Sequence, residues 1–155
     1  MARKRSAGIL LYRRTPSLEV LLVHPGGPFW AKKDLGVWSI PKGEYDDDED
    51  PLACALREFE EETGTRLEAP PDPVDLGTVR QKSGKVVQAW AVEGDLDVAS
   101  VRSNTFEMEW PPRSGQTRSF PEVDRAEWFS LDAARERINP AQAAFLDRLE
   151  AQFES

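Results

Sequence analysis

The sequence contains one cysteine, Cys54, and one histidine, His24. A single cysteine excludes an internal disulfide, and a chain without disulfides fits a reducing compartment. Cys54 falls within a helical pattern, so we interpret it as a small packing residue rather than a nucleophile. His24 ends an apolar run, and we interpret it as a packing residue at a strand end, with a catalytic base as the alternative.

Long apolar runs are also missing. No stretch approaches the roughly 20 residues that a membrane-spanning helix needs. The first residues are basic, but the apolar stretch before Tyr12 is too short for a secretory signal peptide. We therefore expect a cytoplasmic protein without a membrane partner.

Basic residues are fewer than acidic ones, and the formal net charge is −8. Long nucleic acids favour a basic surface, so we expect none as a partner. A small phosphorylated substrate is still compatible, because a bound cation inverts the local field. With 155 residues, 39% hydrophobic and 31% charged, the chain is expected to form one globular domain over residues 1–155.

The strongest local pattern lies in residues 43–65. Asp50 followed by Pro51 is typical of a helix start, and Gly64 is typical of a helix end. Between these signals, apolar side chains and one threonine recur on one helical face. They are Leu52, Ala55, Leu56, Phe59 and Thr63. The pattern predicts a helix that packs this face on a core.

Three glutamates lie beside that face. Glu58, Glu61 and Glu62 stand at i, i+3 and i+4, so their carboxylates share one side of the helix. Neighbouring carboxylates repel one another, whereas Mg²⁺ is held by carboxylate oxygens and completes its shell with water and substrate phosphates. A solvated acidic face is the alternative interpretation of such a run.

A longer frame favours the metal site. The residues Gly43, Glu49, Arg57, Glu58, Phe59, Glu61, Glu62 and Gly64 fit Gly-x5-Glu-x7-Arg-Glu-U-x-Glu-Glu-x-Gly-U, where U is a bulky apolar residue. This frame, over residues 43–65, resembles the signature box of the Nudix hydrolases. Thr65 departs from it, since an aliphatic residue is usual there. The strand-rich flanks also resemble the family's fold, which implies an α/β (α+β) protein, an α/β/α sandwich with a mixed sheet.

The resemblance implies a metal-dependent hydrolase that cleaves a pyrophosphate bond in a nucleoside diphosphate linked to another group. Glu58, Glu61 and Glu62 would hold Mg²⁺ or Mn²⁺, and Gly43 would allow the backbone to approach the metal. Glu61 and Glu58 are both candidates for the general base. Homodimers are common in the family, so a homodimer is kept open as an alternative to a monomer, although no segment of the sequence establishes one.

Other site residues follow from the same resemblance. Arg57 would orient the box glutamates through an ion pair, Glu49 would support the site, and Gly64 would end the helix. A further acid from outside the box is often used as a ligand or base. The candidates are Glu107, Glu109 and Glu122, of which we place Glu107 in the catalytic set.

Four residues are candidates for substrate binding. Lys42 precedes the box glycine, where phosphates would lie, and its Pro-Lys-Gly context resembles Nudix members acting on diadenosine and diphosphoinositol polyphosphates. Phe29 and Trp30 stand in a loop rich in proline and glycine and could stack on a nucleobase or cover the core. Arg80, near a turn, could contact phosphate. We rank dinucleoside polyphosphates first, nucleoside triphosphates (including oxidised guanine nucleotides) second and ADP-ribose or nucleotide sugars third.

Two functions without catalysis are also considered. A nucleotide sensor could keep this fold, and a protein-interaction module could use the acidic face. Both are disfavoured because the glutamates of the box are all present.

The remaining elements are predicted from apolar runs and alternation. Strands are expected at 6–13, 18–24, 36–43, 74–81, 85–93, 104–110 and 124–130. Helices are expected at 131–138 and 141–153, and loops or turns at 15–17, 24–36, 67–75 and 111–124.

Overall fold

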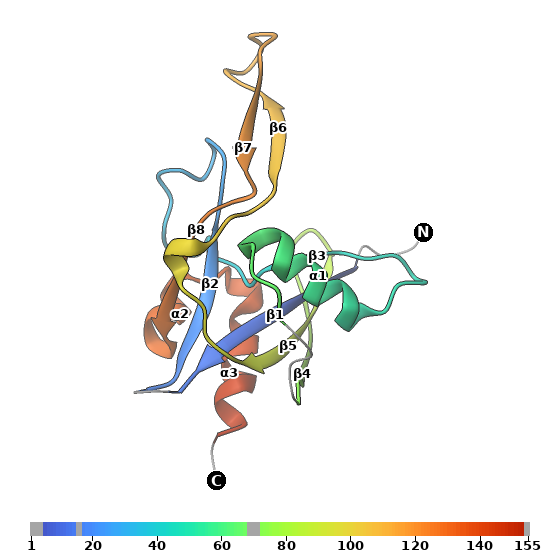
Figure 1. Cartoon of the computed structure of the whole chain (residues 1–155), viewed down its shortest axis with the longest axis vertical. Helices are drawn as coiled ribbons and strands as arrows, with labels where there is room; N and C mark the ends of the chain where they lie inside the picture. Colours follow the sequence, from blue (N-terminus) through green and yellow to red (C-terminus); the bar gives the residue numbers. More distant parts are fainter. Residues whose placement is uncertain (1–4, 15–16, 68–71, 154–155) are drawn as a thin grey trace.

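A mixed β-sheet lies at the centre of the structure, a computed structural model that describes residues 5–14, 17–67 and 72–153 (Figure 1). Its strands run in the order β4-β5-β1-β2-β8, and β3 pairs with β1. The pairing of β1 with β5 is parallel, and the others are antiparallel. The strands are β1 (Arg5–Arg13), β2 (Glu19–Pro25), β3 (Lys42–Glu44), β4 (Val74–Arg80), β5 (Val86–Glu93) and β8 (Val123–Ser130). The predicted mixed sheet is confirmed.

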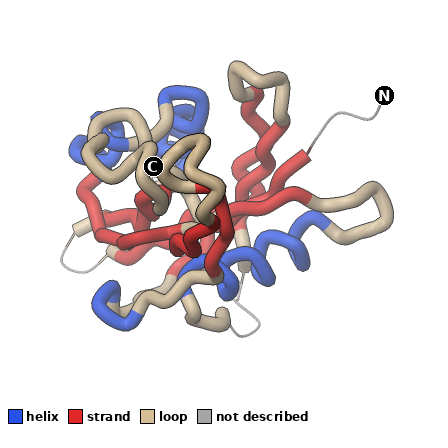
Figure 2. The backbone as a smooth tube through the Cα atoms, turned by 90° about the horizontal axis from the view of Figure 1, so that it is seen from above, coloured by secondary structure: helices blue, strands red, loops and turns tan. Residues whose placement is uncertain are grey.

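Helices cover both faces of this sheet (Figures 1 and 2). Strand β1 is buried on both sides, because its side chains alternate between two cores. Ile9 and Leu11 face α1 (Pro51–Thr63), whereas Leu10 and Tyr12 face the C-terminal helices. Those helices are α2 (Leu131–Arg137) and α3 (Ala143–Ala151). The short turn η1 (Val98–Ser100) follows β5, and η2 (Pro140–Gln142) lies between α2 and α3. The α/β/α layering is therefore confirmed.

A second, two-stranded sheet projects from the main one along the longest axis of the molecule (Figure 1). It is a hairpin of β6 (Thr105–Glu109) and β7 (Thr117–Pro121), with Phe106 opposite Phe120. The prediction of a loop over 111–124 is wrong at β7. The segment has one large apolar residue, so its own sequence carries little alternation, and pairing with β6 decides its conformation.

Two other boundaries differ from the predictions. The strand expected over 36–43 pairs continuously only from Lys42, and Trp38 and Ser39 form single bridges. Pro41 interrupts the ladder because it has no N–H to donate. The last α-helix begins at Ala143, after the η2 turn that Pro140 starts.

Parts of two predicted loops, residues 15–16 and 68–71, lie outside the described residues. No helix among the described residues is both long and apolar enough to cross a membrane.

The packing of α1 on the sheet gives a first prediction. Phe59 is fully buried in the core that contains Ala7 and Ile9. Its replacement by alanine is expected to lower the free energy of unfolding by about 3–5 kcal/mol, through lost burial and the cavity left behind. Urea denaturation measures this loss. The matched control is Phe29→Ala, since that ring is 62% exposed, and a similar loss in both variants would contradict the prediction.

Candidate active site

The helix α1 begins and ends where the sequence predicts. The Asp50 carboxylate accepts a hydrogen bond of 2.9 Å from the Ala53 N–H, and Pro51 is the first helical residue. Gly64 has a φ of 77°, a left-handed conformation that favours glycine, and its N–H donates to the Glu60 carbonyl. With Phe59 in the core, the glutamates are left on the flank that faces β3 and β8.

Gly43 lies directly against that flank. Its backbone pairs with Ala7 of β1, and a Cβ at this position would overlap the Glu58 carboxyl carbon. A side chain here would therefore push Glu58 away from β3. Glycine is needed for close approach between the strand and the carboxylate.

Arg57 is the cation within the acidic flank. Its guanidinium pairs with Glu49, lies 3.4 Å from Glu58 Oε1 and lies 3.9 Å from Glu61 Oε1. These groups are partly exposed, so each pair contributes little stability. Their shared guanidinium instead restricts where the carboxylates can point.

Glu62 points differently from Glu58 and Glu61. It is buried, and its carboxylate accepts a hydrogen bond of 2.7 Å from the Lys42 N–H. Burial raises the pKa of Glu62 to about 8, although the Lys42 N–H and ammonium oppose the shift. Burial also lowers the pKa of Lys42, and the neighbouring Lys85 lowers it further. Lys42 and Glu62 thus lie next to each other beside Gly43, where both side chains are largely shielded from water.

Glu122 is the acid outside the box that the structure brings to the glutamates. It stands between β7 and β8, and its pKa is raised by partial burial and by the negative charge of Glu61. In turn, its charge helps to raise the pKa values of Glu58 and Glu62, after burial as the main cause. These effects require the four carboxylates to be near one another.

Glu107 and Glu109 lie elsewhere, exposed on β6. The Glu109 carboxylate accepts a hydrogen bond of 2.7 Å from the Arg113 N–H near the hairpin tip. Neither acid is among the charges of largest effect on the box glutamates. The one signal for Glu122 in the sequence is its position next to a predicted strand, which also describes many solvated acids.

The donor set suits a hard cation, but it is not assembled as a ligand group. Nowhere in the described part of the chain do three acidic, histidine or cysteine side chains gather closely enough to hold a metal. Arg57 engages Glu58 and Glu61, and Lys42 engages Glu62. Burial and then the negative charge of Glu61 raise the pKa of Glu58, although Arg57 opposes the shift. Carboxylate oxygens are donors that Mg²⁺ and Mn²⁺ prefer, so the residue types fit these cations.

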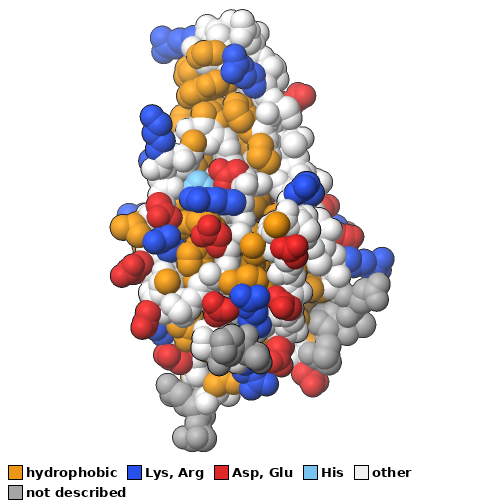
Figure 3. Space-filling model, turned by 60° about the vertical axis from the view of Figure 1, so that its left-hand side comes forward, with side chains coloured by type: hydrophobic (Ala, Val, Ile, Leu, Met, Phe, Trp, Pro, Cys, Tyr) orange, Lys and Arg blue, Asp and Glu red, His pale blue; other side chains and the backbone are white. Residues whose placement is uncertain are grey.

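The predicted aromatic residues lie on the loop 26–36. Phe29 is 62% exposed and packs edge-on against Trp110 of the hairpin, with ring centroids 5.9 Å apart. Trp30 is 40% exposed, with the Lys33 ammonium 5.2 Å from its ring centroid. Figure 3 shows hydrophobic side chains over this face of the projecting end, with Lys and Arg at its margins. The two aromatics are thus accessible and do not cover the core.

Arg80 lies at the exposed end of β4. Across the same turn, the Lys85 ammonium pairs with Glu44 at 3.3 Å. The structure therefore brings Lys85, rather than Arg80, to Lys42 and the box.

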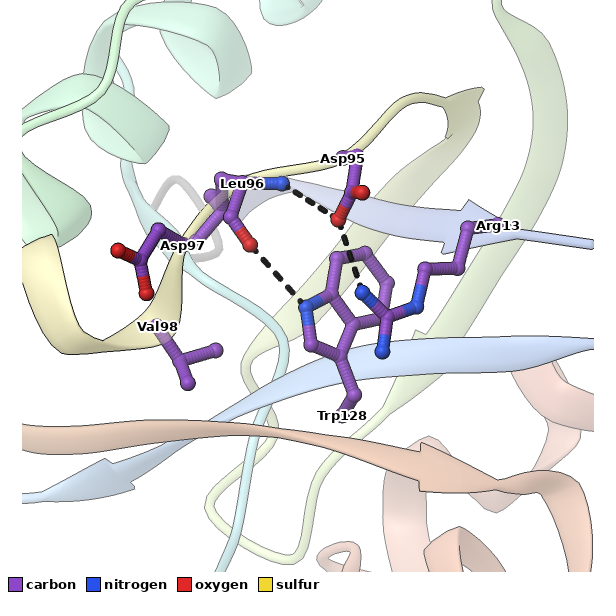
Figure 4. A pocket seen from close by; sticks show the side chains of 6 residues that line it. All are labelled: Arg13, Asp95, Leu96, Asp97, Val98 and Trp128. Atoms are coloured by element: carbon purple, nitrogen blue, oxygen red, sulfur yellow. Dashed lines mark hydrogen bonds and ion pairs between the residues drawn. The ribbon is translucent and has the colours of Figure 1, made fainter. Parts of the chain in front are cut away.

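A surface groove of about 520 Å³ lies at the other end of β1 (Figure 4). There the Arg13 guanidinium stacks 4.1 Å from the Trp128 ring centroid and pairs with Asp95 at 2.9 Å. Because these groups satisfy one another and none belongs to the box, we assign the active site to the acidic flank of α1.

Comparison with known families shows which family the chain belongs to. A model of the NUDIX domain matches residues 2–149. The chain belongs to the Nudix family. Among its relatives, an RNA pyrophosphohydrolase from Agrobacterium fabrum is 23% identical over 163 residues, which cover 90% of this chain and 91% of that protein. The mRNA-decapping protein g5R of African swine fever virus is 59% identical over 32 residues, 21% of this chain and 13% of that protein.

Solved Nudix structures share the fold. A Caenorhabditis elegans Ap4A hydrolase in a binary complex has a TM-score of 0.67 at 22% identity and covers 95% of this chain and 96% of its own. The NUDIX domain of Shewanella oneidensis NrtR, complexed with ADP ribose, has a TM-score of 0.68 at 20% identity and covers 99% and 90%. Membership and relatives together make the chain a Nudix pyrophosphohydrolase.

The raised pKa of Glu62 predicts a pH effect on the metal-free protein. In the fold, the Glu62 carboxyl keeps its proton to about pH 8. In the unfolded chain it loses this proton near pH 4.3, an approximate reference value. The group therefore stabilises the fold, and its full contribution is present below the pKa of the unfolded state, the lower of the two values. That stability is lost as the pH rises through the higher value. The Tm of the wild type in EDTA is therefore expected to fall more steeply from pH 5 to pH 8 than that of Glu62→Gln.

The matched control for this pH effect is Glu60→Gln, which removes one negative charge from the same helix. It should keep the pH slope of the wild type. Equal slopes for the wild type and Glu62→Gln would contradict the prediction.

Proposed function

We propose that this Nudix protein hydrolyses a phosphoanhydride bond in a substrate with an extended phosphate chain, and that a dinucleoside polyphosphate is its preferred class. The position of Lys42 carries the proposal. Its ammonium lies in a desolvated position next to the acid Glu62 and near Lys85. Positive charge beside a carboxylate cluster suits several phosphates bound together with a cation.

Each box residue has a role in this proposal. Glu58, Glu61 and Glu62 would hold Mg²⁺ or Mn²⁺, with Gly43 leaving room for the approach. The bound cation would lower the pKa of a water molecule and neutralise charge on the phosphates. Arg57, paired with Glu49, limits the orientations of the glutamates before the cation binds.

Glu122 is our candidate for an acid–base group. Burial and Glu61 raise its pKa from the ordinary range of a glutamate. A carboxylate whose pKa is closer to the working pH is a better proton acceptor than an ordinary one. Glu61 and Glu58 are the alternatives for the base within the box.

The aromatic loop would bind the nucleoside. Phe29 and Trp30 offer exposed ring faces, and Lys33 places a cation beside them. Stacking on an aromatic ring contributes about 1–3 kcal/mol per base and tolerates any base. This arrangement fits a nucleotide end and leaves the identity of the base open.

A nucleoside 5′-triphosphate, free or at the 5′ end of RNA, is the second candidate substrate. It is supported by the RNA pyrophosphohydrolases that match 89–90% of this chain. The net charge of −8 disfavours long contacts with nucleic acid, but recognition of one phosphorylated end needs few cations. ADP-ribose is the third candidate, supported by the bound ligand of the NrtR domain.

Replacement of Glu61 by glutamine tests the reaction. The variant is expected to lose at least about a hundredfold in kcat at about 5 mM Mg²⁺ or Mn²⁺, the size of a typical acid–base contribution. Product analysis would cover diadenosine tetraphosphate, a nucleoside triphosphate, a 5′-triphosphorylated RNA oligonucleotide and ADP-ribose. Glu60→Gln is the matched control. A wild-type rate for Glu61→Gln on the preferred substrate would contradict its role.

A second pair of variants separates the two acids outside the box. Glu122→Gln is expected to lower kcat by about 10²–10⁴-fold, whereas Glu107→Gln is expected to keep the wild-type rate. Steady-state kinetics on the preferred substrate measures both. The opposite result would restore Glu107 as the acid supplied from outside the box.

A further inference from the structure

His24 is the one histidine of the chain, and it lies buried at the end of β2 with 1% of its surface exposed. Both ring nitrogens have a partner. Nδ1 is 2.8 Å from Oδ1 of Asp124 on β8, and Nε2 is 2.7 Å from the carbonyl oxygen of Lys33 on the loop 26–36. The ring therefore connects the end of β2, the aromatic loop and β8.

The segments that meet at His24 all lead to the proposed site. The loop leaves β2 at Gly26, whose N–H donates to the Glu122 carbonyl at 2.9 Å. On its return, Asp34 accepts a hydrogen bond of 2.8 Å from Trp38 Nε1. The Trp38 ring also lies edge-on to His24, with centroids 5.1 Å apart. The His24 contacts thus lie between the base-binding loop and the strand that begins beside Glu122.

The two partners of His24 are both hydrogen-bond acceptors. A neutral imidazole can donate to one of them, and an imidazolium can donate to both. An apolar side chain of similar size would fill the space but donate to neither. The Lys33 carbonyl would then lose its tie to β2, while Asp124, whose side chain is 34% exposed, could turn to water. A residue that only fills the core would need neither of these two hydrogen bonds.

From this geometry we propose that His24 is a positioning residue, which holds the loop 26–36 against β8 so that Phe29 and Trp30 keep one orientation relative to Glu122. The inference rests on the proposed function in assigning nucleoside binding to this loop. His24 touches no reacting atom in this scheme. Its loss therefore affects substrate affinity much more than the chemical step.

The test begins with His24→Leu, which keeps an apolar fill, and His24→Gln, which keeps one amide donor. In His24→Leu, KM for the preferred substrate is expected to rise about tenfold, the size of one lost hydrogen bond and its ordering effect. The value of kcat should stay within about threefold, because the box is untouched. His24→Gln should recover part of the lost affinity.

A second readout reports on the loop without any substrate. Lys32 and Lys33 are trypsin sites within the loop, so a loop that is released is cleaved faster there. In His24→Leu, cleavage after these lysines is expected to accelerate about tenfold, while the other tryptic sites keep their rates. Mass spectrometry of brief digests assigns each cut.

Arg148→Gln is the matched control. The Arg148 guanidinium donates to the Leu76 and Thr78 carbonyls at 2.9 Å each, so its replacement also removes two contacts between elements, but far along the chain from the loop. It should lower the Tm without faster cleavage after Lys32 or Lys33. Should His24→Leu fail to fold, His24→Phe, which keeps an aromatic ring but can donate to neither partner, must show the same local acceleration.

The outcomes separate the inference from the proposed function. Unchanged cleavage after Lys32 and Lys33 in the folded His24→Leu or His24→Phe variant contradicts the proposed positioning role. Faster cleavage with KM unchanged and kcat lowered overturns the role in affinity. Faster cleavage in a protein that hydrolyses none of the four substrates supports the positioning role and rejects the proposed function.

Discussion

One hydrogen bond, from the Lys42 N–H to the buried Glu62 carboxylate, ties the helix α1 to the strand β3. It gives the Glu62 carboxylate a hydrogen-bond partner in a desolvated position, which burial alone would disfavour. The overlap that any Cβ at Gly43 would create with Glu58 belongs to the same junction. The close approach of Glu58 and Glu62 to β3 depends on this junction.

Much of the fold could be predicted from the sequence where the signals are local. Asp50, Pro51 and Gly64 act within one turn of the backbone, so the limits of α1 are as expected. Strand β2 also follows from a continuous apolar run, and β5 follows from apolar residues that flank a predicted turn. Local signals could not reveal β7, since Phe120 gains its partner only when Phe106 lies opposite it. Pro41 likewise shortens a strand that the apolar pattern extends.

The site was predictable in its residue types and only partly in its geometry. The spacing of Glu58, Glu61 and Glu62 places them on one helix, but the turn of Glu62 towards Lys42 depends on a different strand. The choice among Glu107, Glu109 and Glu122 depends on how the hairpin leaves the main sheet. Glu107 and Glu109 lie on a predicted strand and Glu122 lies just before the next one, and the fold brings Glu122 to Glu61.

The projecting hairpin also keeps two groups apart, because Glu122 lies at its base and Trp110 lies at its far end. Its base is anchored beside Glu122, and its far end carries Trp110 against Phe29. Adding two residues to each strand would keep the side chains on their present faces and move the tip by about 7 Å. Such a change would leave the acidic flank of α1 as it is. The length of the hairpin therefore sets how far Trp110 at its far end lies from the glutamates.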